Sequence, residues 1–153
     1  TTEIYTLSLH DALPICNQAA PNHENPVFGT ARVVEGLCRL DDSFSVRTMI
    51  AAGKDWLKAA RNGDGGWGGA PGVKSSIEET ALAVTALALC GEAAAVSAGI
   101  DYLAGETGRG AVFPARPIGL YFSSLWYSEA LYPVVFTGHA LRTVREAGVL
   151  SPD

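Results

Sequence analysis

Cysteine, histidine and methionine are scarce in this chain of 153 residues, which holds three, three and one of them respectively. The cysteines, Cys16, Cys38 and Cys90, are widely spaced and form no C-x-x-C pair. This pattern argues against a disulfide framework and a zinc site, and it favours free thiols in a reducing compartment. We expect Cys38 and Cys90 to behave as small buried hydrophobes, and we expect no metal site.

The chain also lacks an excess of basic residues and any long apolar run. The chain has 11 Lys and Arg against 16 Asp and Glu, for a net charge of −5. An acidic balance argues against a surface for nucleic acid. No run of about 18 apolar residues is present, so the sequence predicts no membrane-spanning helix. A hydrophobic content of 48% is sufficient for the core of a single domain.

Apolar residues recur at spacings of three and four, which predicts an all-α fold. Ser43 and Ser75 or Ser76 are suited to begin helices, and Gly91 is suited to end one. The helix that ends at Gly91 is small or apolar all round from Thr80 onward, which indicates burial on every side. We expect helices over Val27–Leu40, Phe44–Ala60, Ile77–Cys90, Ala94–Gly105 and, broken near Pro133, most of Gly119–Arg145.

The most distinctive stretch is Ala52–Gly69, where a helix gives way to a glycine-rich turn that carries Trp67. A tryptophan in a flexible turn wastes its apolar surface unless it packs back on the fold. Two interpretations stay open, a surface turn with a chance tryptophan and a clasp that joins one helical hairpin to its neighbour.

A weaker copy of this stretch follows 46 residues later. Trp56 corresponds to Tyr102 and Trp67 corresponds to Phe113 at that spacing. A repeat of about 45 residues with two helices per unit is typical of stacked or closed helical arrays.

These residues resemble the QW repeat of the squalene–hopene cyclase and oxidosqualene cyclase family. The matching positions are Ala52, Trp56-Leu57, Gly65 and Trp67, whereas Arg61 stands where the family usually has Gln. The segments Asn25–Val34 and Pro117–Val144 resemble the same family, so the resemblance covers nearly all of residues 22–144.

The resemblance implies a partial α/α toroid and a role in triterpene cyclisation. The implied substrate is a linear polyprene such as squalene, which would be cyclised through carbocations without a cofactor. Peripheral membrane association of the intact enzyme on the cytoplasmic side is compatible with it. Buried helices such as Ile77–Cys90 would form the inner ring of the toroid and amphipathic ones such as Phe44–Ala60 the outer ring.

A cavity that guides carbocations needs aromatic walls, because a desolvated cation over an aromatic face is stabilised by ~2 kcal/mol or more. The resemblance places Tyr121 at a cavity aromatic and Phe28 near a cavity Tyr of the family. We add Phe122 and Trp126, which lie close to Tyr121 in an aromatic-rich segment. Core packing is the alternative for each of these aromatic residues.

The acid that would start cyclisation is not found in the sequence. The family uses an Asp-x-Asp-Asp motif, and Asp41-Asp42 at a helix boundary is better explained as a cap. Neither His23 nor His139 has a paired carboxylate in the sequence pattern. We therefore expect no catalytic residue here and an acid in a preceding part of the same protein. The alternative is a non-catalytic helical-repeat binding module that kept the toroid and lost the acid.

The first fifteen residues, Thr1–Ile15, resemble residue for residue the translation of a sequencing adapter. We expect this segment to be artefactual and exclude it from the fold. The alternative is a native amphipathic N-terminus. The remaining residues, 16–153, are expected to be the C-terminal part of a squalene-cyclase-type toroid domain.

Overall fold

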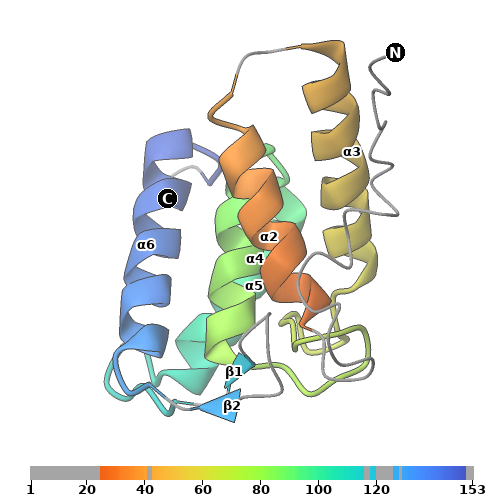
Figure 1. Cartoon of the computed structure of the whole chain (residues 1–153). Coiled ribbons are helices and arrows are strands. Elements are labelled where there is room, and N and C mark those ends of the chain that lie inside the picture. Colours follow the sequence, from red (N-terminus) through yellow and green to blue (C-terminus); the bar gives the residue numbers. More distant parts are fainter. Residues whose placement is uncertain (1–24, 41–42, 116–117, 120–125, 128, 151–153) are drawn as a thin grey trace.

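A computed structural model describes residues 25–40, 43–115, 118–119, 126–127 and 129–150. These residues form an all-α fold, as predicted, with one short pair of strands (Figure 1). The elements are α2 (Pro26–Leu37), α3 (Phe44–Ala59), α4 (Ile77–Leu89), α5 (Ala93–Glu106), β1 (Ile118–Gly119), β2 (Trp126–Tyr127) and α6 (Tyr132–Ala147).

Helix α4 is the centre of the fold. Every residue from Ile77 to Ala88 is buried, and α2, α5 and α6 all pack against this helix (Figure 1). Alanine and other small side chains let the neighbouring helices approach α4 closely on several sides. The prediction that this helix is buried all round is confirmed.

Side-chain caps explain where the helices begin. Ser76 Oγ accepts a hydrogen bond from the Glu79 backbone N–H at 3.2 Å, and Ser76 Oγ donates to the Glu79 carboxylate in return. Asn25 Nδ2 donates to Glu79 Oε1 at 2.8 Å, which joins the start of α2 to the start of α4. Ser43 caps α3 in the same manner, by accepting from the Val46 N–H.

The segment before α6 corrects the sequence prediction. We expected helix over most of Gly119–Arg145, but Ile118 pairs with Tyr127 and Gly119 pairs with Trp126 in an antiparallel ladder. Aromatic residues favour strands, and a strand pair at this point is incompatible with one continuous helix. The predicted helix is therefore wrong at Gly119 and at Trp126–Tyr127.

Pro133 begins a helix instead of breaking one. It lies in the first turn of α6, where a residue without an N–H loses no intrahelical hydrogen bond. Among the described helices, none combines the length and the apolar character needed to cross a membrane.

Candidate functional site

Trp67 lies fully buried beneath the glycine-rich turn that follows α3. Its indole Nε1–H donates to the Leu57 carbonyl of α3 at 2.7 Å, and its backbone N–H donates to Thr80 Oγ1 of α4 at 2.9 Å. The Trp67 carbonyl accepts from the Ser76 N–H at 2.9 Å. One residue in the turn is thus bonded to the end of one helix and the start of the next.

The turn itself is closed by polar side chains. Asp64 Oδ1 accepts from the Gly66 N–H and from Ser75 Oγ, both at 2.9 Å. Asn62 Nδ2 donates to the Val73 carbonyl at 2.7 Å. Gly65 has a φ of +89°, which favours glycine. These contacts hold the loop in the form that turns Trp67 inward, so Asp64 has a structural role.

Helix α5 covers the other side of Trp67. A Cβ atom added to Gly99 of α5 would clash with Val84 Cγ2 of α4 and would lie 3.1 Å from Trp67 Cζ3, so this glycine lets α5 approach both α4 and the indole. Trp56 is half-buried against the same core. Trp67 therefore joins α3, α4 and α5, and the chance surface tryptophan is excluded. That this clasp is a repeat of the family type stays a prediction.

The second copy of the clasp is less buried. Tyr102 and Phe113 are both half-buried, whereas Trp67 is not exposed at all. Thr107, which stands where the repeat has Gln, donates to the Leu103 carbonyl at 2.7 Å and accepts from the Gly110 N–H at 3.0 Å. A hydroxyl at the helix end thus makes local bonds that close the turn.

The aromatic ring of Phe28 faces a cation. The guanidinium carbon of Arg32 lies 5.7 Å from the Phe28 ring centroid and 5.3 Å from that of Phe136. Both distances are within the range of a cation–π contact. Phe28 is half-buried on α2 and Phe136 is half-buried on α6, so Arg32 bridges these two helices.

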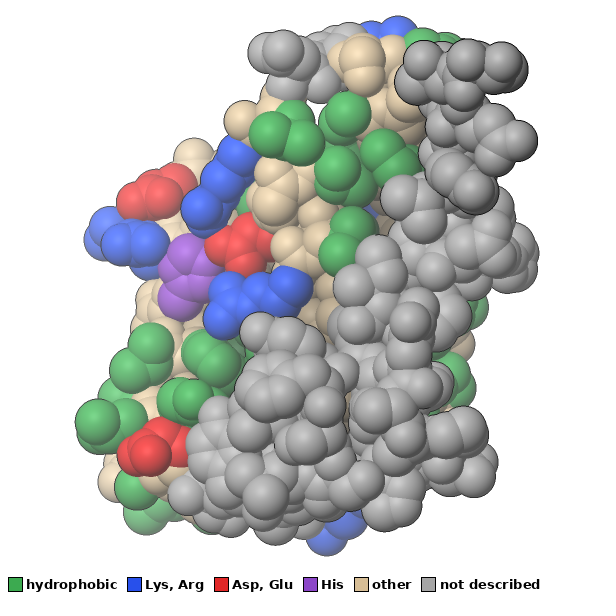
Figure 2. Space-filling model, viewed as in Figure 1, with side chains coloured by type: hydrophobic (Ala, Val, Ile, Leu, Met, Phe, Trp, Pro, Cys, Tyr) green, Lys and Arg blue, Asp and Glu red, His purple; other side chains and the backbone are tan. Residues whose placement is uncertain are grey.

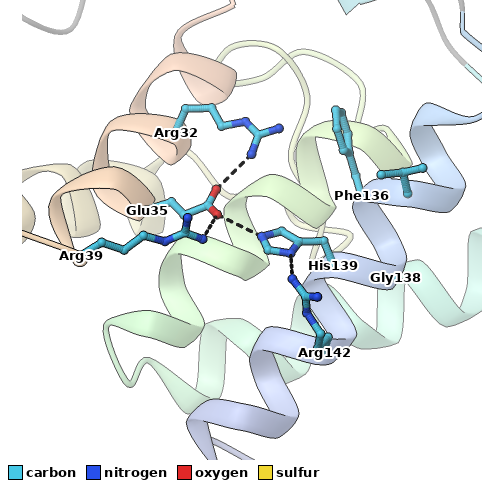
Figure 3. Close-up of a pocket in the computed structure, with 8 residues that line it drawn as sticks. Arg32, Glu35, Arg39, Phe136, Gly138, His139 and Arg142 are labelled. Carbon is cyan, nitrogen blue, oxygen red and sulfur yellow. Dashed lines mark hydrogen bonds and ion pairs between the residues drawn. The ribbon is translucent and has the colours of Figure 1, made fainter.

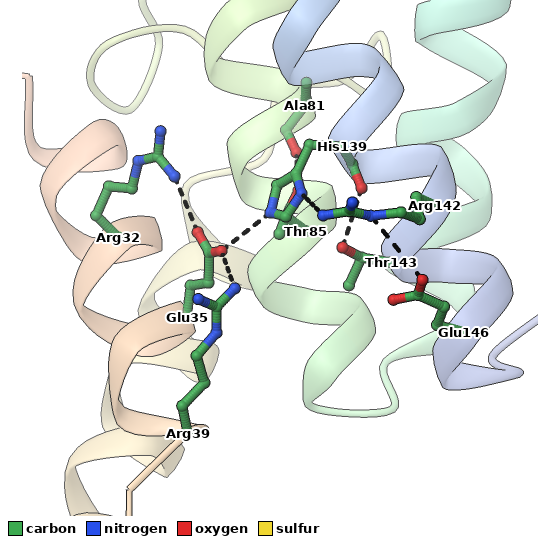
Figure 4. Close-up of polar contacts among 9 residues, drawn as sticks. All are labelled: Arg32, Glu35, Arg39, Ala81, Thr85, His139, Arg142, Thr143 and Glu146. Atoms are coloured by element: carbon green, nitrogen blue, oxygen red, sulfur yellow. Dashed lines mark hydrogen bonds and ion pairs between the residues drawn. The ribbon is translucent and has the colours of Figure 1, made fainter.

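A polar cluster extends this contact along the seam between α2 and α6 (Figures 3 and 4). Glu35, whose side chain is 9% exposed, accepts from Arg32 Nη1 at 3.0 Å and from Arg39 Nη2 at 2.8 Å. His139 Nε2 lies 3.0 Å from Glu35 Oε1. One nearly buried carboxylate thus receives three donors, from α2, from the turn that follows α2 and from α6.

The cluster also determines the tautomer of His139. Arg142 Nη2 lies 3.1 Å from His139 Nδ1. A guanidinium is always protonated and has no acceptor, so Nδ1 must accept this bond. In this geometry Nε2 carries a proton and donates to Glu35.

Opposing effects act on the pKa of Glu35. Burial on its own raises the pKa of this carboxyl, but the hydrogen bonds from His139 and Arg32 together with the Arg32 charge outweigh burial. The pKa of Glu35 therefore lies below its ordinary value, and the group is ionised at neutral pH.

The two described cysteines, Cys38 and Cys90, are free, half-buried and packed against the core. Burial and the neighbouring Cys38 raise the pKa of Cys90 to about 12, so it stays a protonated thiol at neutral pH. Within the described part of the chain, no three His, Cys, Asp or Glu side chains gather as a metal site would require.

Residues 23–145 match the model of the squalene-hopene cyclase C-terminal domain. This match covers well over half of the chain. The chain belongs to the squalene-hopene cyclase C-terminal domain family. No curated protein and no solved structure matches it. The family resemblance on which the sequence analysis depended is therefore confirmed, while the residues that line a cavity are not tested by it.

The family match does not place the four predicted cavity residues together. Tyr121 and Phe122 lie outside the described residues, and of Trp126 only the backbone, in β2, is described. Phe28 is the one member whose side chain is described, and its described ring contact is Arg32. A shared cavity wall in this cyclase-family domain stays a prediction.

The polar cluster was not predicted from the sequence. The expectation that His139 has no paired carboxylate is wrong, because Glu35 lies 3.0 Å from it across 104 residues of sequence. Helix packing alone brings these residues together. A usable signal was present in the sequence, where Arg32, Glu35 and Arg39 follow one another at helical spacing.

Replacing Glu35 with Gln is expected to lower the free energy of unfolding at neutral pH by about 1.5–3 kcal/mol. The substitution removes a charged acceptor that three donors share. The pKa of Glu35 is lowered in the folded chain, so its contribution is present above the unfolded-state value and is lost as the pH falls through the folded one. Urea unfolding followed by circular dichroism at neutral and acidic pH would measure this.

The matched control for this prediction is Glu146→Gln. Glu146 is 64% exposed and lies 3.9 Å from Arg142, so the substitution should change stability little. The stability difference between the parent chain and Glu35→Gln should shrink in acid. A difference that is constant with pH would contradict the assigned role of the Glu35 charge.

Proposed function

We propose that the intact protein is a triterpene cyclase of the squalene–hopene type, which cyclises a linear polyprene such as squalene through carbocations. The observation that carries this proposal is the family match over residues 23–145. The chain would be the C-terminal part of the enzyme, with Thr1–Ile15 as an artefactual segment. The reaction is an isomerisation, so no cofactor is required.

In this proposal the chain supplies part of the cavity wall. Phe28, Tyr121, Phe122 and Trp126 would face the carbocations, because aromatic faces stabilise a cation without quenching it. The clasp around Trp67 would hold the wall in place by joining α3, α4 and α5. The proposed location is the cytoplasmic side, with peripheral membrane association of the intact enzyme.

The starting acid would come from a part of the protein outside this sequence. Protonation of an alkene needs a positioned acid that holds its proton until substrate is bound. Glu35 does not meet this requirement, because its lowered pKa leaves it ionised at neutral pH. Glu79 accepts from Asn25 and Ser76 and caps α4, which explains its burial without a catalytic role. The 153-residue chain alone should therefore be inactive.

A second candidate is a non-catalytic helical-repeat binding module. Two observations favour it. The second clasp is degraded, with Phe113 only half-buried, and the Phe28 ring already faces the Arg32 guanidinium. A cation bound there by the protein reduces the room for a substrate cation.

The test uses the complete gene product with squalene. We expect a cyclic product with the same mass as the substrate, measured by gas chromatography and mass spectrometry. Tyr121→Ala should lower turnover about 30-fold, which corresponds to the loss of ~2 kcal/mol of cation–π stabilisation in the transition state. Tyr121→Phe is the matched control, because it keeps the aromatic face, and should stay near the parent rate.

Each outcome separates the two candidates. Absence of any cyclic product from a folded complete protein would favour the binding module. Equal turnover in Tyr121→Ala and Tyr121→Phe would remove Tyr121 from the cavity wall while leaving the enzyme class intact.

A further inference from the structure

An open pocket of about 540 Å³ lies on the seam between α2 and α6 (Figure 3). Its polar lining consists of Arg32, Glu35, Arg39, His139 and Arg142. Arg32 and Glu35 come from α2, Arg39 comes from the turn that follows α2, and the other two come from α6. Figure 2 shows basic, acidic and histidine side chains side by side on this face of the molecule. Residues far apart in the sequence thus form one concave, mostly basic surface.

The charge of this lining is not balanced. Three arginines face a single carboxylate, Glu35, in a chain whose net charge is −5. A further acid, Glu146, is outside the lining and lies 3.9 Å from Arg142, at the limit of an ion pair. Positive charges that gather without matching acids attract an anion from solution.

The arginines also keep unused donors. Each guanidinium carries five N–H donors, and Arg32 and Arg39 each direct one N–H to Glu35. Arg142 directs one N–H to His139 Nδ1. The three side chains are between 41% and 66% exposed, so their remaining N–H groups are accessible from the pocket. Glu35 lies behind them at 9% exposure.

Apolar residues line the pocket beside the arginines. Val135 is 57% exposed, and Phe136 is half-buried beside Arg32. Gly138 also lines the pocket, and a Cβ atom added there would meet nothing within 4 Å. The pocket can therefore hold a charged group together with a short apolar segment.

We propose that this pocket binds a phosphate or diphosphate group through Arg32, Arg39 and Arg142. The planar fork of a guanidinium matches two phosphate oxygens at once, and several forks together favour a group of more than one negative charge. The phosphate can be free in solution or can end an apolar chain. This site does not depend on the proposed cyclase function, because squalene carries no charge.

The test is a calorimetric titration of the full chain with inorganic diphosphate at constant ionic strength. We expect saturable binding at one site. Arg39→Gln and Arg142→Gln should each weaken it at least tenfold. Arg145→Gln is the matched control, because it removes the same charge from α6 outside the pocket, and it should leave the affinity unchanged.

Gly138→Leu tests the pocket without altering any charge. The new side chain enters open space and should abolish diphosphate binding. The thermal midpoint of unfolding should stay equal or rise, because leucine is a better helix former than glycine. This variant keeps the test decisive if an arginine variant fails to fold.

Two further ligands identify the source of the phosphate. Geranyl diphosphate binding at least tenfold more tightly than inorganic diphosphate, with no binding of geraniol, would assign the pocket to a phosphate at the end of an apolar chain. Equal affinity for both diphosphates would assign it to the free anion. Two results would overturn the proposal. One is the absence of saturable binding, and the other is binding that persists in Arg39→Gln, Arg142→Gln and Gly138→Leu. Either result would leave the cluster with only a structural role, as a set of contacts between α2 and α6.

Discussion

Trp67→Ala is expected to destabilise the fold by about 3–5 kcal/mol, as truncation of a buried tryptophan does. The indole is fully buried, and the substitution would leave a cavity where α3, α4 and α5 meet. It would also leave the Leu57 carbonyl without its 2.7 Å donor. Because domains of this size are stable by only about 5–15 kcal/mol, the variant should lose a large share of its free energy of unfolding.

Two controls separate packing from hydrogen bonding in this prediction. Trp67→Phe keeps most of the apolar volume and loses the Nε1 donor, so it should cost about 1–3 kcal/mol. Trp56→Ala removes a half-buried tryptophan at the surface of the core, and it should cost less than Trp67→Ala. Urea unfolding followed by circular dichroism would measure all three. Equal losses at Trp56 and Trp67 would contradict the clasp.

Gly68→Ala is expected to be the next most harmful change, with a loss of about 1–3 kcal/mol or more. A Cβ atom at Gly68 would clash with the Val73 carbonyl and lie 2.6 Å from the Lys74 carbonyl oxygen. Both obstacles are backbone atoms, so no change of rotamer relieves the clash. The loop that turns Trp67 inward would have to open.

The matched control is Gly63→Ala in the same loop. A Cβ atom at Gly63 would meet nothing within 4 Å, and no positive φ is recorded there. Gly63→Ala should therefore leave stability unchanged or raise it by up to about 1 kcal/mol through the unfolded state. Thermal unfolding would measure both variants. A similar loss of stability in both would show that the loss comes from the glycine content of the loop and not from the close approach of residues 68 and 73.

Local sequence signals were sufficient to predict most of the helices. The Ser76 capping box, the Gly91 stop and the small-residue run after Thr80 correctly predicted the start, the end and the burial of α4. Trp67 was also informative, because a large apolar side chain in a glycine turn has few alternatives to burial. Predicted and observed helix bounds differ most at the start of α6, which begins at Tyr132 and not near Gly119. The next largest difference is at the end of α2, which stops at Leu37 and not at Leu40.

The failures have one physical source, which is contact between residues distant in sequence. Helical spacing in Gly119–Arg145 was outweighed by the pairing of Gly119 with Trp126, which depends on a partner strand and not on local propensity. Glu35 and His139 meet only because α2 and α6 both pack on α4. The sequence pattern of one helix contains no information on which residues of another helix it contacts.

Sequencing the source gene upstream of the codons for Ile15 and Cys16, with long reads free of adapters, tests the central claim most directly. The enzyme proposal predicts a cyclase reading frame that continues upstream of Cys16, contains an Asp-x-Asp-Asp motif and lacks Thr1–Ile15. An upstream frame without that motif would favour the binding module. Thr1–Ile15 in the genome, with no cyclase frame before it, would contradict the claim that this chain is the C-terminal part of a polyprene cyclase.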